Sequence, residues 1–148
     1  KAMTKLRIAA LALASLGLAG AVEARPLTPA EQRYSRYSGA LPACDDPTVL
    51  SRIQSRFSTR ESGYWNSPLE IQGYDRVREI GWRSWGADHI PRRYCMARGY
   101  FNDMKLRQVS YWIGEDLGMI GWGYGVEWCV HGLDRNHAFA PDCKMARP

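Results

Sequence analysis

Two cysteines and two histidines lie close together in the last part of this 148-residue sequence. Cys129, His131, His137 and Cys143 could supply the four ligands of a tetrahedral zinc site, but their spacing matches neither the common zinc ribbons nor the zinc fingers. Cysteines of exported proteins usually pair with each other, and the start of this sequence has the features of an export signal. We therefore interpret the cluster as a disulfide with two nearby surface histidines, and we expect no metal and no cofactor.

Acid–base chemistry has two candidates in this sequence. His89 follows Asp88 in a region bounded by glycine and proline, and Glu127 lies in a segment with strand-like alternation. Neither accompanies a nucleophile motif, because the sequence contains no Gly-x-Ser-x-Gly, no His-Glu-x-x-His and no glycine-rich phosphate loop. We expect Glu127 to pair with an arginine such as Arg98 or Arg107, and we assign no catalytic residue.

Glycines alternate with large residues in the segment that contains Glu127. On a single strand, Gly121, Gly123 and Gly125 would share one face and the aromatic residues the other. Such a bare strip lets another backbone, an aromatic ring or a sugar approach closely, although the chain's own arm or tail could also fill it. We expect most of the six tryptophans to be buried. The candidate binding residues are Arg98, Arg107, Gly121, Gly123, Gly125 and Glu127.

Residues 44–148 are predicted to form the domain that positions these groups. Asp46 is the expected N-cap of a helix that has Pro47 at its first position and ends near Gly63. Its apolar stripe comprises Val49, Leu50, Ile53 and Phe57. Four strands rich in β-branched and aromatic residues follow, at about 71–85, 93–101, 106–114 and 119–131, with a bulge in the first at Gly73 or Gly81.

A helix followed by four strands in a meander predicts an α+β fold. The single N-terminal helix would pack on a curved four-stranded antiparallel sheet, as in a roll of the cystatin or NTF2-like kind. The tail from Leu133 to Pro148 has no period and is expected to lie across the sheet, fixed by Cys143.

The beginning of the sequence has the features of an export signal. Lys5 and Arg7 precede an uncharged run from Ile8 to Val22, and we expect signal peptidase to cleave after Ala24. The alternative is a membrane anchor, although the run is shorter than the roughly 20 residues that a spanning helix needs. Residues 25–43 would then be a flexible arm. Without residues 1–24 the formal charge falls from +5 to +3, and the scattered arginines do not indicate nucleic-acid binding.

All four cysteines lie after the expected cleavage site. An even number in an exported chain predicts two disulfides, and three pairings are possible. We favour Cys44 with Cys95, which would join the helix start to a strand, and Cys129 with Cys143, which would close a short loop.

Several short motifs resemble those of small exported proteins of unknown function from alphaproteobacteria. The motifs are Cys44-Asp45-Asp46-Pro47, Ile90-Pro91-Arg92-Arg93-Tyr94-Cys95, Gly125-Val126-Glu127-Trp128-Cys129-Val130, Gly132-Leu133-Asp134-Arg135 and Cys143-Lys144-Met145-Ala146-Arg147-Pro148. The resemblance implies a periplasmic or secreted location and a shared cysteine framework, and it supplies no activity.

The leading hypothesis is a non-enzymatic module that binds an envelope protein or polymer through the glycine-bearing face of the sheet, because arginine and aromatic side chains dominate such interfaces. One alternative is a small-ligand or hydrolytic pocket between helix and sheet. Another is a structural subunit of an envelope assembly.

Overall fold

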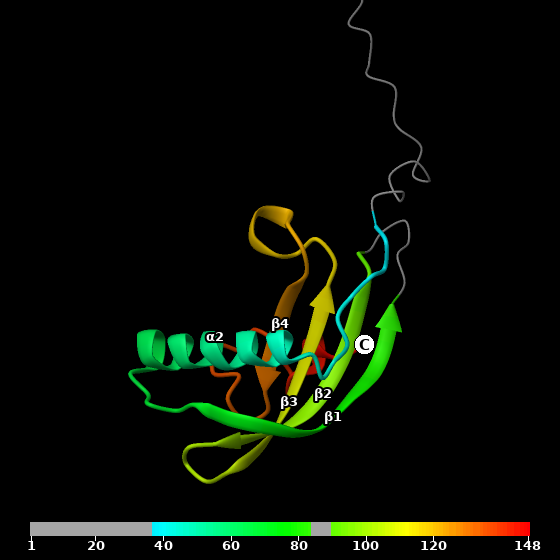
Figure 1. Cartoon of the computed structure of the whole chain (residues 1–148). Coiled ribbons are helices and arrows are strands. Elements are labelled where there is room, and N and C mark those ends of the chain that lie inside the picture. The colour runs from blue at the N-terminus through cyan, green and yellow to red at the C-terminus, as the bar shows by residue number, and fades with distance from the viewer. Residues whose placement is uncertain (1–36, 84–89) are drawn as a thin grey trace, which may run out of the picture.

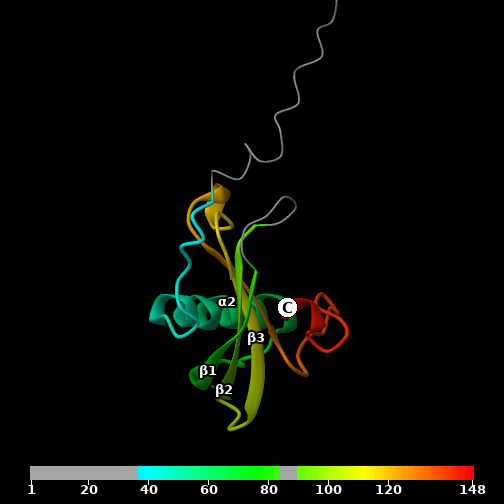
Figure 2. The same ribbon diagram turned by 90° about the vertical axis from the view of Figure 1, so that its right-hand side faces the viewer.

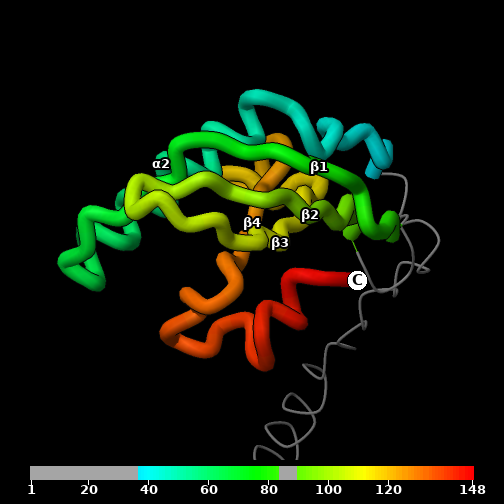
Figure 3. The backbone as a smooth tube through the Cα atoms, turned by 90° about the horizontal axis from the view of Figure 1, so that it is seen from below, coloured from blue at the N-terminus to red at the C-terminus, as the bar shows by residue number. Residues whose placement is uncertain are grey.

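The computed structural model describes residues 37–83 and 90–148. One helix, α2 (Pro47–Trp65), crosses one face of a four-stranded antiparallel sheet whose strands lie side by side in chain order (Figure 1). These strands are β1 (Ile71–Arg83), β2 (Arg92–Phe101), β3 (Leu106–Gly114) and β4 (Gly125–Val130). The tail after β4 lies against the opposite face of the sheet, as Figures 2 and 3 show. The predicted α+β class is confirmed.

The helix begins where the sequence predicted and ends slightly later. The carboxylate of Asp46 accepts a hydrogen bond of 2.8 Å from the Thr48 N–H, and Pro47 occupies the first turn. The chain stays helical through Gly63 and stops only at Asn66, whose left-handed backbone lets its N–H donate to the Glu61 carbonyl. Gly63 is exposed, and glycine at such a position costs only about 1 kcal/mol, so it does not end the helix.

The first three strands follow the predicted pattern closely. A bulge was predicted at Gly73 or Gly81, and the register of β1 against β2 shifts beside both glycines and a third time between Asp75 and Arg78. The third strand has the predicted bounds, and the second starts at Arg92. Trp85, the predicted end of the first strand, lies outside the described residues, as do His89 and the expected signal peptide.

The predicted fourth strand is wrong in its first half. Only Gly125–Val130 is strand, whereas Met119–Gly121 is a 3₁₀ turn. The chain folds back on itself here, because a Cβ on Gly118 would lie 1.9 Å from the Trp122 carbonyl oxygen and a Cβ on Gly125 would lie 2.1 Å from that of Leu117. The residues between these two glycines therefore form a loop. The expected alternation holds only from Val126 onward.

Two disulfides hold the tail and the helix start to the sheet. Cys44 pairs with Cys95 and Cys129 with Cys143, so the favoured connectivity is confirmed. The first pair lies in the core between helix and sheet, where the Tyr111 hydroxyl donates to the Cys44 carbonyl at 2.6 Å. The second pair fixes the tail on the other face, as predicted. Among the helices of the described chain, none is both long and apolar enough to cross a bilayer.

Candidate functional site

The loop between β3 and β4 exposes large apolar side chains. We call Leu117–Tyr124 the apolar loop. Met119, Ile120 and Trp122 are 82%, 90% and 83% exposed. In Figure 1 this loop, in orange, projects beyond the upper end of the sheet. Contiguous exposed apolar residues on a small domain indicate an interaction site, because they would otherwise be buried in the core.

The backbone of the apolar loop is closed by its own hydrogen bonds. Gly118 N–H donates to the Gly123 carbonyl at 3.1 Å, Gly121 N–H to the Gly118 carbonyl at 3.2 Å, and Trp122 N–H to the Met119 carbonyl at 3.1 Å. Ile120 adopts a left-handed conformation with φ of 56° and ψ of 31°. A β-branched residue is an outlier there, and such outliers cluster at functional sites. The fold therefore retains an unfavourable conformation at the tip of this loop.

Helix α2 holds the returning side of the apolar loop. The Arg52 guanidinium lies 4.6 Å from the centre of the Tyr124 ring and donates to the Tyr124 carbonyl at 3.0 Å. The Tyr124 hydroxyl is 2.7 Å from the Thr48 hydroxyl. Between helix and loop lies an open hollow of about 650 Å³. Its lining residues are Arg52, Ser55, Arg56, Gly118, Met119, Ile120, Trp122, Gly123 and Tyr124.

Glu115 fixes the other side of the loop to the start of the described chain. Its carboxylate accepts hydrogen bonds from the Ser38 N–H at 2.7 Å, the Ser38 hydroxyl at 2.8 Å and the Gly39 N–H at 2.7 Å. Burial alone would raise the pKa of Glu115, but these three hydrogen bonds outweigh it and lower the pKa. Part of the predicted arm, residues 37–43, is thus attached beside the apolar loop and leaves Gly121 and Gly123 uncovered.

The tryptophans are less buried than the sequence suggested. Of those in the described residues, only Trp128 is buried, while Trp65, Trp82 and Trp122 are exposed and Trp112 is half-buried. Arginines lie over all of them except Trp122. The stacked pairs are Arg135 over Trp65, Arg93 over Trp82, Arg92 over Trp112 and Arg60 over Trp128. Trp122 therefore differs from the other described tryptophans in having neither burial nor a stacked cation.

The predicted binding residues do not converge on one surface. Gly121 and Gly123 belong to the apolar loop, where both have positive φ, whereas Gly125 begins β4 and faces the Leu117 backbone. A single bare strip of three glycines does not form, because the segment is not one strand. The close approach that glycine permits occurs within the chain itself, at Gly118 and Gly125.

Arg98 and Arg107 lie elsewhere and have other partners. Asp75 accepts two hydrogen bonds from the Arg98 guanidinium and one from the Tyr100 hydroxyl, and these bonds, with Arg98 first, lower the pKa of Asp75 to about 2. Arg107 pairs with Asp103 at 2.6 Å. The expected pairing of Glu127 with either arginine is therefore wrong. Both arginines line a shallow groove of about 570 Å³, but each is already neutralised by its aspartate.

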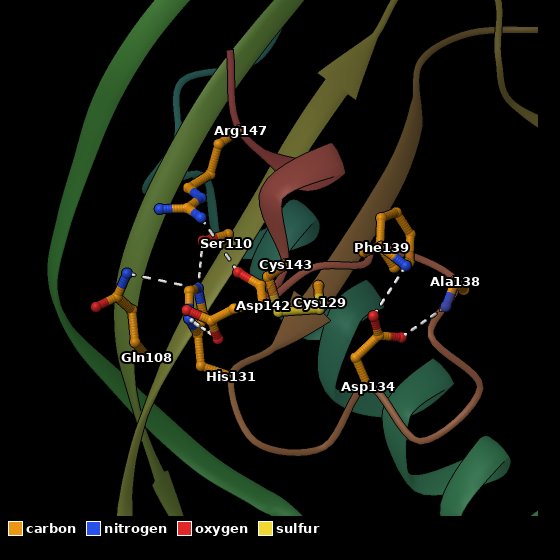
Figure 4. Close-up of a disulfide and its surroundings, with 10 residues drawn as sticks. All are labelled: Gln108, Ser110, Cys129, His131, Asp134, Ala138, Phe139, Asp142, Cys143 and Arg147. Carbon is orange, nitrogen blue, oxygen red and sulfur yellow. Dashed lines mark hydrogen bonds and ion pairs between the residues drawn. A yellow bond between two sulfur atoms is a disulfide. The ribbon is translucent and has the colours of Figure 1, made fainter.

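A serine, a histidine and an aspartate meet beside the second disulfide (Figure 4). The sequence analysis did not predict this arrangement. His131 Nδ1 is 3.2 Å from Asp142 Oδ1, and Nε2 is 2.9 Å from Ser110 Oγ. These distances resemble those of a hydrolase triad. However, the Ser110 side chain is 0% exposed under the tail, so its oxygen cannot reach a substrate. The three residues instead join the tail to β3 and β4, next to Cys143.

The remaining chemical hypotheses find little support in the described residues. Cys129 and Cys143 are bridged, and no three His, Cys, Asp or Glu side chains of residues 37–83 and 90–148 are grouped to hold a metal. Phe57, Tyr111 and Trp128 fill the space between helix and sheet where a ligand pocket was considered. Trp112 lies on the opposite face of the sheet, under Arg92.

The chain matches no protein-family profile, no curated protein and no solved structure.

Proposed function

We propose that this chain is an exported, non-enzymatic binding module of the cell envelope, and that the apolar loop is its binding surface. In this proposal residues 1–24 are a cleaved signal peptide, the domain is a cystatin- or NTF2-like roll, and the protein acts in the periplasm or outside the cell. Two disulfides suit an oxidising compartment.

The uncovered tryptophan is the observation that carries the proposal. Trp122 is 83% exposed and follows the exposed Met119 and Ile120, on a loop whose backbone is internally bonded. Its ring has no stacked arginine, unlike the other tryptophans of the described residues. Tryptophan is the residue type most enriched among those that dominate binding energies. The loop is preorganised, so little conformational entropy is lost when a partner binds.

A retention assay on isolated envelopes tests the proposal. The purified exported protein is mixed with the envelope fraction, and the bound share is measured after sedimentation. Trp122→Ser is compared with Tyr64→Ser, because Tyr64 is an equally exposed aromatic at the far end of α2. We expect Trp122→Ser to lose at least about nine-tenths of the retention and Tyr64→Ser to retain it. Equal retention of both variants and the unsubstituted protein would contradict a binding role for the apolar loop.

A further inference from the structure

We propose that the partner of the apolar loop is the surface of an anionic lipid bilayer. Met119, Ile120 and Trp122 would enter the interfacial region while Arg52 and Arg56 contact lipid phosphates. This inference rests on the binding role proposed above and specifies its partner.

The shape of the apolar loop favours a bilayer over the groove of a protein. Met119, Ile120 and Trp122 lie within four consecutive positions at a projecting tip, and each is more than four-fifths exposed. Tryptophan is enriched at membrane–water interfaces, where its ring is partly in the apolar layer and its N–H remains in polar surroundings.

The hydrogen bonding of the loop lowers the cost of entering an apolar layer. A backbone N–H or carbonyl that leaves water without a partner costs several kcal/mol, which is why irregular backbone is rare in lipid. Here the Gly118, Gly121 and Trp122 N–H groups donate within the loop, to the carbonyls of Gly123, Gly118 and Met119. The tip can therefore enter the interface with these backbone groups already paired.

The charge beside the loop matches an anionic surface. The hollow between loop and helix is lined by two arginines and by no acidic side chain. Arg52 uses one nitrogen for the Tyr124 carbonyl, and a guanidinium has five N–H donors, so others remain available for phosphate. Arg56 is more exposed and has one longer bond, of 3.4 Å, to the Val126 carbonyl. The acidic residues preceding the loop are Glu115, which is held by Ser38 and Gly39, and the exposed Asp116.

Vesicle flotation tests the inference on the purified exported protein. Vesicles of phosphatidylcholine alone are compared with vesicles that also contain phosphatidylglycerol. We expect binding to the anionic vesicles only, weakened by added salt. Trp122→Ser should weaken binding at least about tenfold, because a large side chain no longer leaves water. Arg56→Gln should weaken it about fivefold, and Arg56→Lys should leave it unchanged, because the net charge contributes most at a lipid surface.

Matched variants outside the proposed surface serve as controls. Tyr64→Ser removes an exposed aromatic, Met104→Ser removes an exposed methionine from the turn after β2, and Arg78→Gln removes an arginine from β1. We expect none of them to change flotation. Equal losses from Trp122→Ser and Tyr64→Ser, or no flotation with anionic vesicles, would overturn the inference. If flotation fails while envelope retention still depends on Trp122, the partner is a protein or polymer; if both fail, the binding role itself is wrong.

Discussion

Replacing Ile120 with glycine should make the protein more stable while weakening its binding. Ile120 has φ of 56°, and a left-handed conformation costs an L-residue roughly 1–2 kcal/mol. Its side chain is 90% exposed, so removing it loses little burial. Glycine gains roughly 0.5–1 kcal/mol of additional backbone entropy in the unfolded chain, which offsets part of the relieved strain. The net expectation is a rise of about 0.5–1 kcal/mol in the free energy of unfolding, or about 2–4 °C in Tm.

Met119→Gly is the matched control for this prediction. Met119 is the neighbouring residue, is also exposed, and is not among the residues with positive φ. The same change should therefore lower the free energy of unfolding by about 0.5–1 kcal/mol, since no strain is relieved. Urea unfolding followed by tryptophan fluorescence measures both variants, and both should bind envelopes less well. If Ile120→Gly destabilises the protein as much as Met119→Gly does, the strain argument is wrong.

Three further predictions concern the groups that hold the fold. Because its pKa is lowered, Glu115 should stabilise the attachment of the arm above its ordinary pKa of 4.5 and lose that effect as the pH falls through the lowered pKa. The protection of the Ser38 and Gly39 amides, measured as hydrogen exchange relative to the intrinsic rate at each pH, should therefore fall at low pH and should be low at every pH in Glu115→Gln. Protection that stays the same at every pH would refute this. The pKa of Asp75 is lowered to about 2, so its hydrogen bond to Arg98 should persist at pH 3.5. A chemical-shift titration that showed a protonated Asp75 carboxyl at pH 3.5 would contradict this. Replacing both Cys129 and Cys143 with alanine should lower the free energy of unfolding by about 3 kcal/mol, as expected for a sequence separation of 14, and an unchanged urea midpoint would count against a tail held by this bond.

Local signals in the sequence predicted much of the fold. Asp46 and Pro47 define the helix start through their own chemistry, and the third strand has the predicted bounds. Pairing of Cys129 with Cys143 followed from their short separation. These features depend on neighbouring residues, so a sequence pattern is enough to predict them.

The apolar loop could not be predicted in the same way. Alternation of Ile120 and Trp122 with glycines is the pattern of a half-buried strand, but Gly121 and Gly123 take positive φ, which a strand does not use. The only sequence signal for this loop was two glycines among large apolar residues. That pattern is as typical of a tight loop as of a strand with a bare glycine face. The contact of Ser110, His131 and Asp142 depends on where the disulfide places the tail, which no local pattern specifies.

Site-specific photo-cross-linking in exporting cells tests the role of the apolar loop most directly. A benzoylphenylalanine is placed at the position of Met119 in one variant and at that of Met104 in the other, both of which are exposed tips on the same sheet. We predict envelope adducts from the Met119 position only, and their loss when Trp122→Ser is added. No adduct from the Met119 position, or the same adducts from both positions, would contradict the binding surface proposed for this protein.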